Sequence, residues 1–191
     1  MEIIANNKLS IKEQLVSSID TLATMSIVAE TSIKSFKNLN IRQISQKLFD
    51  YFAKYDYKID RKNFGVITID KKRIVASLNY LLSDDEMAAY LAIPSILKHG
   101  IVIGMHDNHK GRKVQTVTIA APVLIDEKHC FVATVIKRTN KDYYKVHRVL
   151  CADDFALKIN VDDNKKENLA HVADANAPAI TSETHVGTVP K

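Results

Sequence analysis

The segment from residue 106 to residue 148 concentrates side chains that can bind phosphate or transfer protons. Its intervening residues are apolar and favour strands, so the polar side chains are expected on one face of a small sheet. They are His106, His109, Lys110, Arg112, Lys113, Thr116, Thr118, Lys137, Arg138, Lys145, His147 and Arg148. A cationic face with histidines is suited to hold a phosphate-rich partner or to carry out acid–base chemistry on it, which points to nucleic acid.

Cleavage of RNA by its own 2′-hydroxyl needs a base, an acid and cations that stabilise the charge on the phosphorane. Histidine titrates near neutral pH and can carry both proton transfers without a metal. We expect the catalytic set to be His106, His109, Lys110, Thr118, Lys145 and His147. We expect the nucleic-acid-binding set to be Arg112, Lys113, Thr116, Lys137, Arg138 and Arg148.

Other chemistries find less support in the sequence. His106 and His109 could ligate zinc, but a structural zinc site wants four ligands, and Cys130 and Cys151 form no second close pair. The sequence has no Gly-rich phosphate loop, no G-x-S-x-G motif and no paired-carboxylate motif. We therefore expect no metal and no cofactor. The two cysteines lie in apolar runs, which favours a reducing compartment.

Charge is unevenly placed along the chain. The 191 residues carry a net charge of +5, but residues 153–191 hold four lysines and seven acids. Residues 1–152 therefore carry 23 basic and 15 acidic groups, a net charge of +8. This excess favours an anionic partner, although a well-charged soluble surface would look the same.

Helical patterns dominate the first half of the chain. Apolar residues recur at three- and four-residue spacing over 10–55, which predicts two amphipathic helices separated near Asn38 and Asn40. A short strand is expected at 66–70 and a helix at 72–82. Ser83 and Glu86 have capping-box spacing, so another helix should run to Gly100, with Pro94 kinking or restarting it.

After Gly100 the pattern changes to strands, at about 101–105, 114–123, 130–137 and 143–150. Short polar turns separate them, as in an antiparallel meander. Alternation then places Lys145 and His147 on one face, and Tyr144 on the other unless a β-bulge intervenes. Helices first and strands second indicate an α+β fold.

Three regions are expected from these patterns. Residues 1–60 form a helical N-terminal segment, 61–155 an α+β domain with nuclease character, and 156–191 a disordered acidic and polar tail. The start of the sequence lacks the apolar core of a secretion signal, and no apolar run is long enough to cross a bilayer.

Four pieces of the chain resemble nuclease domains of the barnase, EndoU, colicin and RelE (BECR) superfamily, which occur in large polyvalent and portal-associated proteins of phages and mobile elements. The matching pieces are AIPSILKHG, HDNHKGR, TVTIAAPV and VIKRTNKDYYKVHRVL. The resemblance covers roughly residues 70–152. It leaves the N-terminal helices and the tail uncovered.

The resemblance implies a metal-independent ribonuclease: a helical segment followed by a curved antiparallel sheet whose concave face holds the site. It places the motif histidine on His106 or His109, with Lys110 and Arg112 beside it. The hydroxyl of the central strand falls on Thr116 or Thr118, and the last-strand set is Tyr144, Lys145 and His147. On this resemblance, His109 and His147 are the preferred proton-transfer pair, and Lys110, Arg112 and Lys137 are expected to hold phosphate. Members of this superfamily act on RNA, often tRNA, as toxins or effectors.

Three functions follow as hypotheses. The first is a toxin-like endoribonuclease, with RNA as substrate and an immunity protein or a phage particle as further partner. The second is a non-catalytic nucleic-acid-binding or virion-interaction module on the same fold. The third is an ADP-ribosyltransferase, against which stands the lack of an E-x-E-type motif after the strands. The expected location is the bacterial cytoplasm or a phage particle, with no membrane partner and the oligomeric state open.

Overall fold

The computed structural model describes residues 10–79, 83–107, 114–139 and 144–153. The first half contains mainly helices. The elements are α1 (Ile11–Ser17), α2 (Ile19–Ala23), β1 (Ala29–Thr31), the 3-10 helix η1 (Ile33–Ser35), α3 (Ile41–Ala53), β2 (Lys58–Arg61), β3 (Gly65–Thr68), α4 (Lys71–Leu78) and α5 (Asp84–His99). The second half contains β4 (Ile101–His106), β5 (Thr116–Ile125), β6 (Lys128–Arg138) and β7 (Tyr144–Asp153). This order confirms the predicted α+β fold.

One seven-stranded sheet organises the molecule, with the strand order β1-β5-β6-β7-β3-β2 and β4 also paired to β5. Strands β4 to β7 form the expected antiparallel meander. The sheet as a whole is mixed, however, because β1 runs parallel to β5 and β3 runs parallel to β7. Of these two strands, β3 agrees with the strand expected at 66–70, whereas β1 was not predicted.

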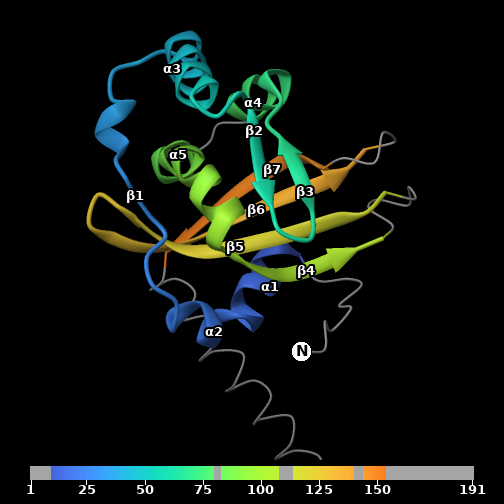
Figure 1. The fold of residues 1–191 in the computed structure, drawn as a ribbon. Coiled ribbons are helices and arrows are strands. Elements are labelled where there is room, and N and C mark those ends of the chain that lie inside the picture. Colours follow the sequence, from blue (N-terminus) through green and yellow to red (C-terminus); the bar gives the residue numbers. More distant parts are fainter. Residues whose placement is uncertain (1–9, 80–82, 108–113, 140–143, 154–191) are drawn as a thin grey trace, which may run out of the picture.

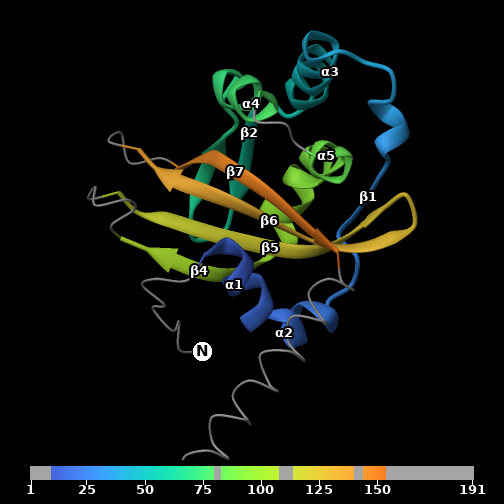
Figure 2. The ribbon, with the colours of Figure 1, turned by 180° about the vertical axis from the view of Figure 1, so that it is seen from behind.

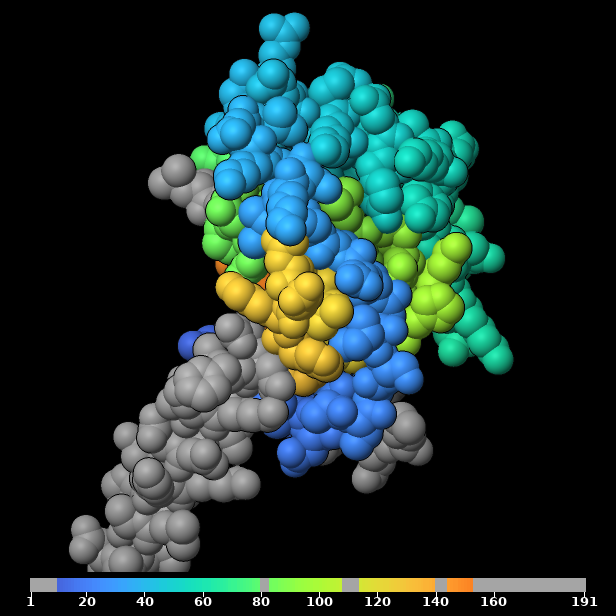
Figure 3. All heavy atoms as spheres, turned by 90° about the vertical axis from the view of Figure 1, so that its left-hand side faces the viewer, coloured from blue at the N-terminus to red at the C-terminus, as the bar shows by residue number. Residues whose placement is uncertain are grey.

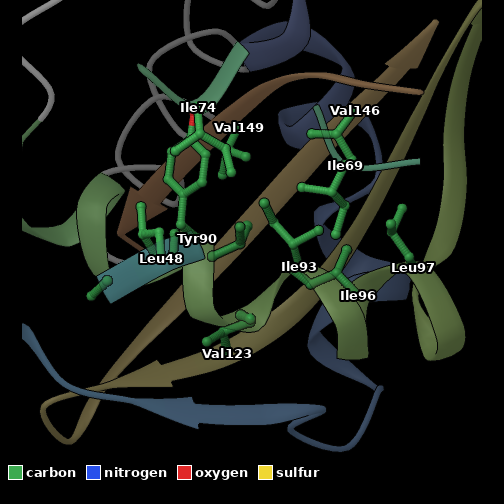
Figure 4. Packing of buried hydrophobic residues seen from close by; sticks show 14 of the residues in the cluster. Leu48, Ile69, Ile74, Tyr90, Ile93, Ile96, Leu97, Val123, Val146 and Val149 are labelled. Atoms are coloured by element: carbon green, nitrogen blue, oxygen red, sulfur yellow. The ribbon is translucent and has the colours of Figure 1, made fainter. Parts of the chain in front are cut away.

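Helices cover both faces of the sheet (Figures 1 and 2). Helices α3, α4 and α5 lie on one side, while α1 and α2 lie on the other. The larger core lies on the α5 side, where Ile93, Ile96 and Leu97 of α5 are fully buried. Figure 4 shows how these side chains meet Val123, Val146 and other strand residues. A smaller core joins Leu15, Ile19 and Leu22 to the opposite face.

The N-terminal region is less helical than its periodicity predicted. Between residues 10 and 55, two short helices are followed by β1 and η1 before α3 begins. Asn40 caps α3 with a capping box, so the break near this residue is confirmed. Residues 29–31 are extended because they pair with the edge of β5, and this tertiary contact interrupts the helical pattern.

Helix α5 starts at the predicted cap and passes through Pro94 without ending. Ser83 and Glu86 form the expected capping box. Proline removes one hydrogen bond from a helix interior. Pro94 is buried among Ile93, Ile96 and Leu97, and packing against the sheet holds the helix together around it.

Within the described part of the chain, no helix has the length and apolar character needed to cross a membrane.

Candidate nucleic-acid interface

Four predicted residues lie in one transverse row across the sheet. His106 of β4 pairs with Thr116 of β5, Thr116 with Lys137 of β6, and Lys137 with Lys145 of β7. Directly paired residues point to the same face, with strands roughly 4.8 Å apart. An imidazole, a hydroxyl and two ammonium groups therefore follow one another over roughly 14 Å of sheet. We call these four residues the cationic row.

The cationic row lies at one end of the sheet. In Figure 1 this is the right-hand end, where β4 ends and β7 begins. His106, Lys137 and Lys145 are partly exposed, whereas Thr116 is only 3% exposed. The imidazole and the ammonium groups can therefore meet a ligand, while the Thr116 hydroxyl lies beneath the surface.

A second line of paired residues runs beside the row, from Gly104 through Thr118 and Val135 to Arg148. Thr118 is 3% exposed and Arg148 is exposed. Arg148 thus adds a guanidinium near the row, but Thr118 has little direct access to solvent. Arg138 pairs with Tyr144 and, by alternation, points to the opposite face from Lys137.

Gln14 of α1 holds the histidine of the row. Its side chain is 2% exposed, and its Nε2 lies 3.0 Å from His106 Nε2. An amide N–H that donates to this nitrogen leaves the ring proton on Nδ1. Gly104 makes the approach possible, since a Cβ there would lie 2.5 Å from Gln14 Cδ.

The sequence contained a signal for Gln14 that the prediction did not use. Ile11, Leu15 and Ile19 form the buried stripe of α1 and α2, and Gln14 falls within this stripe at helical spacing. A polar side chain on an apolar stripe needs a polar partner, because burial without one is costly. The pattern could not reveal that this partner is His106.

Lys145 is also placed by an acidic residue. Its Nζ lies 3.9 Å from Oδ2 of Asp70, the residue that caps α4. Both side chains are about one-third exposed, so the pair adds little stability. Its main effect is to hold the Lys145 ammonium near the β3 side of the row.

His147 lies apart from the row. The pairing between β6 and β7 shifts at this point, because Val135 faces Arg148 while Ile136 faces Val146. This β-bulge breaks the alternation that predicted a shared face for Lys145 and His147. His147 instead lines a small cavity on the α5 side with Tyr90 and Asp70.

Tyr144 lies on the α5 side as well. Its hydroxyl donates to Gln115 Oε1, and its ring packs edge-on against Phe64 at 5.4 Å between centroids. Gln115 Nε2 donates in turn to Asp107 Oδ1 over 3.1 Å. Tyr144 thus packs behind the row, and through Gln115 it joins the beginning of β7 to the residue that follows β4.

The remaining predicted residues lie outside the described part of the chain. These are His109, Lys110, Arg112 and Lys113. Asp107 is the last described residue before them, and His106 precedes it. Among the described residues, no three His, Cys, Asp or Glu side chains gather in a group that could hold a metal ion.

A cavity of about 610 Å³ lies at the far end of β5, between β1, η1, α3 and the β5–β6 turn. Glu30, Asp126 and Glu127 line it together with Lys34. This balance of charge does not suit a phosphate ligand. The described residues predicted to bind phosphate lie at the opposite end of β5 from this cavity.

Comparison with protein families identifies residues 39–150 as a large polyvalent protein-associated domain 3. The match covers more than half of the chain, and the protein belongs to this family. It includes α3 to α5 and nearly all of the strands that form the row. Searches of curated proteins and of solved structures found no match. The predicted association with polyvalent proteins is confirmed.

Proposed function

We propose that this protein is a metal-independent endoribonuclease whose substrate backbone lies along the cationic row. The observation that supports it is the pairing of His106, Thr116, Lys137 and Lys145 across four neighbouring strands. This arrangement offers one proton-transfer group beside two cations on an accessible surface. Such a set meets most of the needs of RNA transesterification by the 2′-hydroxyl.

In the proposed reaction, His106 and His109 carry the two proton transfers. One imidazole accepts the proton of the 2′-hydroxyl, and the other protonates the departing 5′-oxygen. The 2′-oxygen forms a bond to phosphorus as the bond to the 5′-oxygen breaks, which leaves a 2′,3′-cyclic phosphate. His147 has no direct part in this proposal, because its side chain lines a cavity on the α5 side.

Lys137 and Lys145 stabilise the negative charge on the phosphorane, and Arg148 holds a neighbouring phosphate. Ammonium groups on adjacent strands act without rearrangement, so their effect falls on the transition state. The Gln14 amide orients the His106 ring. Lys110, Arg112 and Lys113 follow the same strand in sequence and complete the proposed phosphate contacts.

Membership of a polyvalent protein-associated family is compatible with this proposal but does not specify a ribonuclease. A domain associated with polyvalent proteins works in a chain with other activities, so its substrate can be delivered by its neighbours. A ribonuclease of this kind would damage the RNA of the cell that makes it. We therefore include an immunity protein, or packaging in a phage particle, in the proposal.

The test is incubation of the full chain with total RNA in the presence of EDTA, followed by analysis of the new ends. The wild type should leave 2′,3′-cyclic phosphates. His106→Ala and His109→Ala should each slow cleavage by roughly 10²- to 10⁴-fold, the usual contribution of general acid–base catalysis. The double variant Lys137→Ala with Lys145→Ala should slow cleavage by a comparable factor.

Two matched variants separate this mechanism from general damage. His147→Ala should retain cleavage, because this residue lines the cavity on the α5 side and not the sheet face that carries the row. Lys34→Ala with Lys128→Ala removes two positive charges beside the β5–β6 turn and should also retain it. Cleavage that survives His106→Ala, or that needs a divalent metal, would refute the proposed mechanism.

Non-catalytic binding of nucleic acid is the second candidate. One observation favours it: among the described residues the row contains one histidine, His106, whereas the proposed cleavage needs two proton-transfer groups. RNA that stays intact but binds in a salt-dependent way would select this function over the ribonuclease.

A further inference from the structure

A second basic segment, residues 41–73, includes helix α3 on the helical side of the sheet, away from the cationic row. Residues 41–73 contain nine basic and four acidic side chains, a net charge of +5. This segment spans α3, β2, β3 and the start of α4. It therefore holds most of the net charge of +8 carried by residues 1–152. None of the residues expected to bind nucleic acid from the sequence lies in it.

Aromatic rings lie beneath many of these cations. Six cation–ring pairs occur in the described residues, and all their rings fall within residues 36–64. Energetically significant pairs of this kind occur roughly once per 70–80 residues. The six pairs of the described residues gather in one part of the fold, which places cations and rings side by side there.

Helix α3 orders part of this cluster along one line. Lys47, Tyr51 and Lys54 follow at helical spacing, so they share one side of the helix. Lys54 Nζ lies 5.9 Å from the Tyr51 ring centroid, and Lys98 Nζ of α5 lies 5.8 Å from that of Tyr55. We call these five residues the α3 surface.

The tyrosines of the α3 surface are accessible and firmly placed. Both rings are partly exposed, and their centroids lie 5.7 Å apart. The Tyr51 hydroxyl donates to the Leu91 carbonyl oxygen over 2.6 Å, which ties the ring to α5. The lysines beside them are exposed. A ligand can therefore contact rings and ammonium groups together.

We infer that the α3 surface binds single-stranded nucleic acid without sequence specificity. Exposed ammonium groups would contact phosphates, and bases would stack on Tyr51 and Tyr55. Lysine presents a point charge without the fork of arginine, which suits a backbone contact rather than base recognition. An acidic protein would use the cations but would leave the two rings without a stacking partner.

The inference concerns the same class of ligand as the proposed function, yet it does not require cleavage. The α3 surface and the cationic row lie on different sides of the molecule, since α3 lies on the α5 side and the row on the face that α1 covers (Figures 1 and 2). The α3 surface would hold a strand while the row acts on another part of it.

The test measures binding of a labelled single strand of about 15 nucleotides of 2′-O-methyl RNA to the full chain by fluorescence anisotropy. This probe has no 2′-hydroxyl and cannot be cleaved by transesterification. Lys54→Ala with Lys98→Ala should weaken binding on the order of tenfold and reduce the salt slope by about 1.4, the value for two lost phosphate contacts with a single strand. Lys12→Ala with Lys128→Ala is the control of equal charge: both lysines are exposed, Lys12 lies on α1 on the other side of the sheet, and this variant should bind as the wild type does.

The rings need their own test. Tyr55→Leu should weaken binding about fivefold or more, because stacking on the ring is lost, while Tyr55→Phe should bind normally. Unchanged binding in both the lysine and the leucine variants would overturn the inference. Equal competition by a poly-glutamate peptide would also overturn it, in favour of an acidic partner. Cleavage of ordinary RNA, measured on the same samples, tests the proposed function separately.

Discussion

His106 is positioned by a residue 92 places away in the sequence, because Gln14 of α1 packs over the end of β4 and contacts its ring. Gly104 leaves the space that the Gln14 side chain fills. Helix α1 therefore does more than cover the sheet. It sets the orientation of the described imidazole in the cationic row.

Gly104→Ala should destabilise the protein by about 1–3 kcal/mol, the usual cost of overpacking a filled site. The added Cβ would lie 2.5 Å from Gln14 Cδ, so either the buried Gln14 side chain must leave its contact with His106 or α1 must shift. Urea denaturation measures the change in the free energy of unfolding.

The double variant with Gln14→Ala tells whether this clash is the cause. Removing the Gln14 side chain should recover part of the loss caused by Gly104→Ala, since the two side chains would no longer compete for one space. Strictly additive effects would mean that α1 and β4 do not pack as the structure shows.

At the scale of elements, the β5–β6 hairpin is fastened to the N-terminal half by its turn. Figure 3 shows this hairpin in gold against the blue segment that contains β1. Asp126 accepts hydrogen bonds from the Ser32 hydroxyl and from the Ile33 N–H, the latter at 3.0 Å. The Ser32 hydrogen bond is the largest cause that lowers the pKa of Asp126.

This lowered pKa predicts how stability depends on pH. A carboxyl group with a lower pKa in the folded state stabilises the fold above about pH 4, and the contribution is lost as the pH falls through the folded pKa. Asp126→Asn should therefore flatten the loss of stability between about pH 5 and about pH 2. Asparagine tolerates the positive φ of 45° at this position.

Asp56→Asn is the matched control for this experiment. Asp56 also has a positive φ, of 52°, but its ion pair with Lys58 is exposed and contributes little. Its variant should keep the pH dependence of the wild type. An equal effect of both substitutions would contradict the role given to the Asp126 turn.

Arg61 of β2 ties an edge strand to the end of α5. Its guanidinium donates to the carbonyl oxygens of Leu97 and Gly100, and burial lowers its pKa. Arg61→Ala should cost about 1.5–3 kcal/mol in the free energy of unfolding, as expected for hydrogen bonds from a charged group. Arg61→Lys should recover less than half of this loss in the free energy of unfolding, because one ammonium lacks the forked geometry of the guanidinium. Full recovery by lysine would show that charge alone matters.

At the scale of the whole molecule, α3 belongs to the same core as the sheet. Leu48 and Phe52 of α3 are fully buried in the cluster that also holds Ile93, Val123 and Val149. Figure 4 shows Leu48 beside residues of α5 and the strands. This packing links α3 to the domain that the sequence placed at 61–155.

Phe52→Ala should lower the free energy of unfolding by about 3–5 kcal/mol, the cost of a large cavity in a core. Because one core joins α3 to the sheet, unfolding should remain a single transition. Far-ultraviolet circular dichroism and tyrosine fluorescence should give the same midpoint. Two separate midpoints would instead support an independent N-terminal segment.

The sequence alone determined the α+β class, the meander from β4 to β7 and the cap at Ser83, while the set of side chains that bind phosphate stays a prediction. These features depend on local periodicity, on capping and on the alternation of strand residues. The family resemblance added the association with polyvalent proteins, which the family comparison confirmed.

Only the tertiary structure decided which of those side chains meet. Pairing between strands placed His106 beside Thr116 and Lys137, and one bulge in β7 moved His147 to the other side of the sheet. Register shifts and long-range partners such as Gln14 depend on packing between distant segments. The spacing of residues along the chain does not encode these contacts, because a shift by one residue exchanges the two faces of a strand.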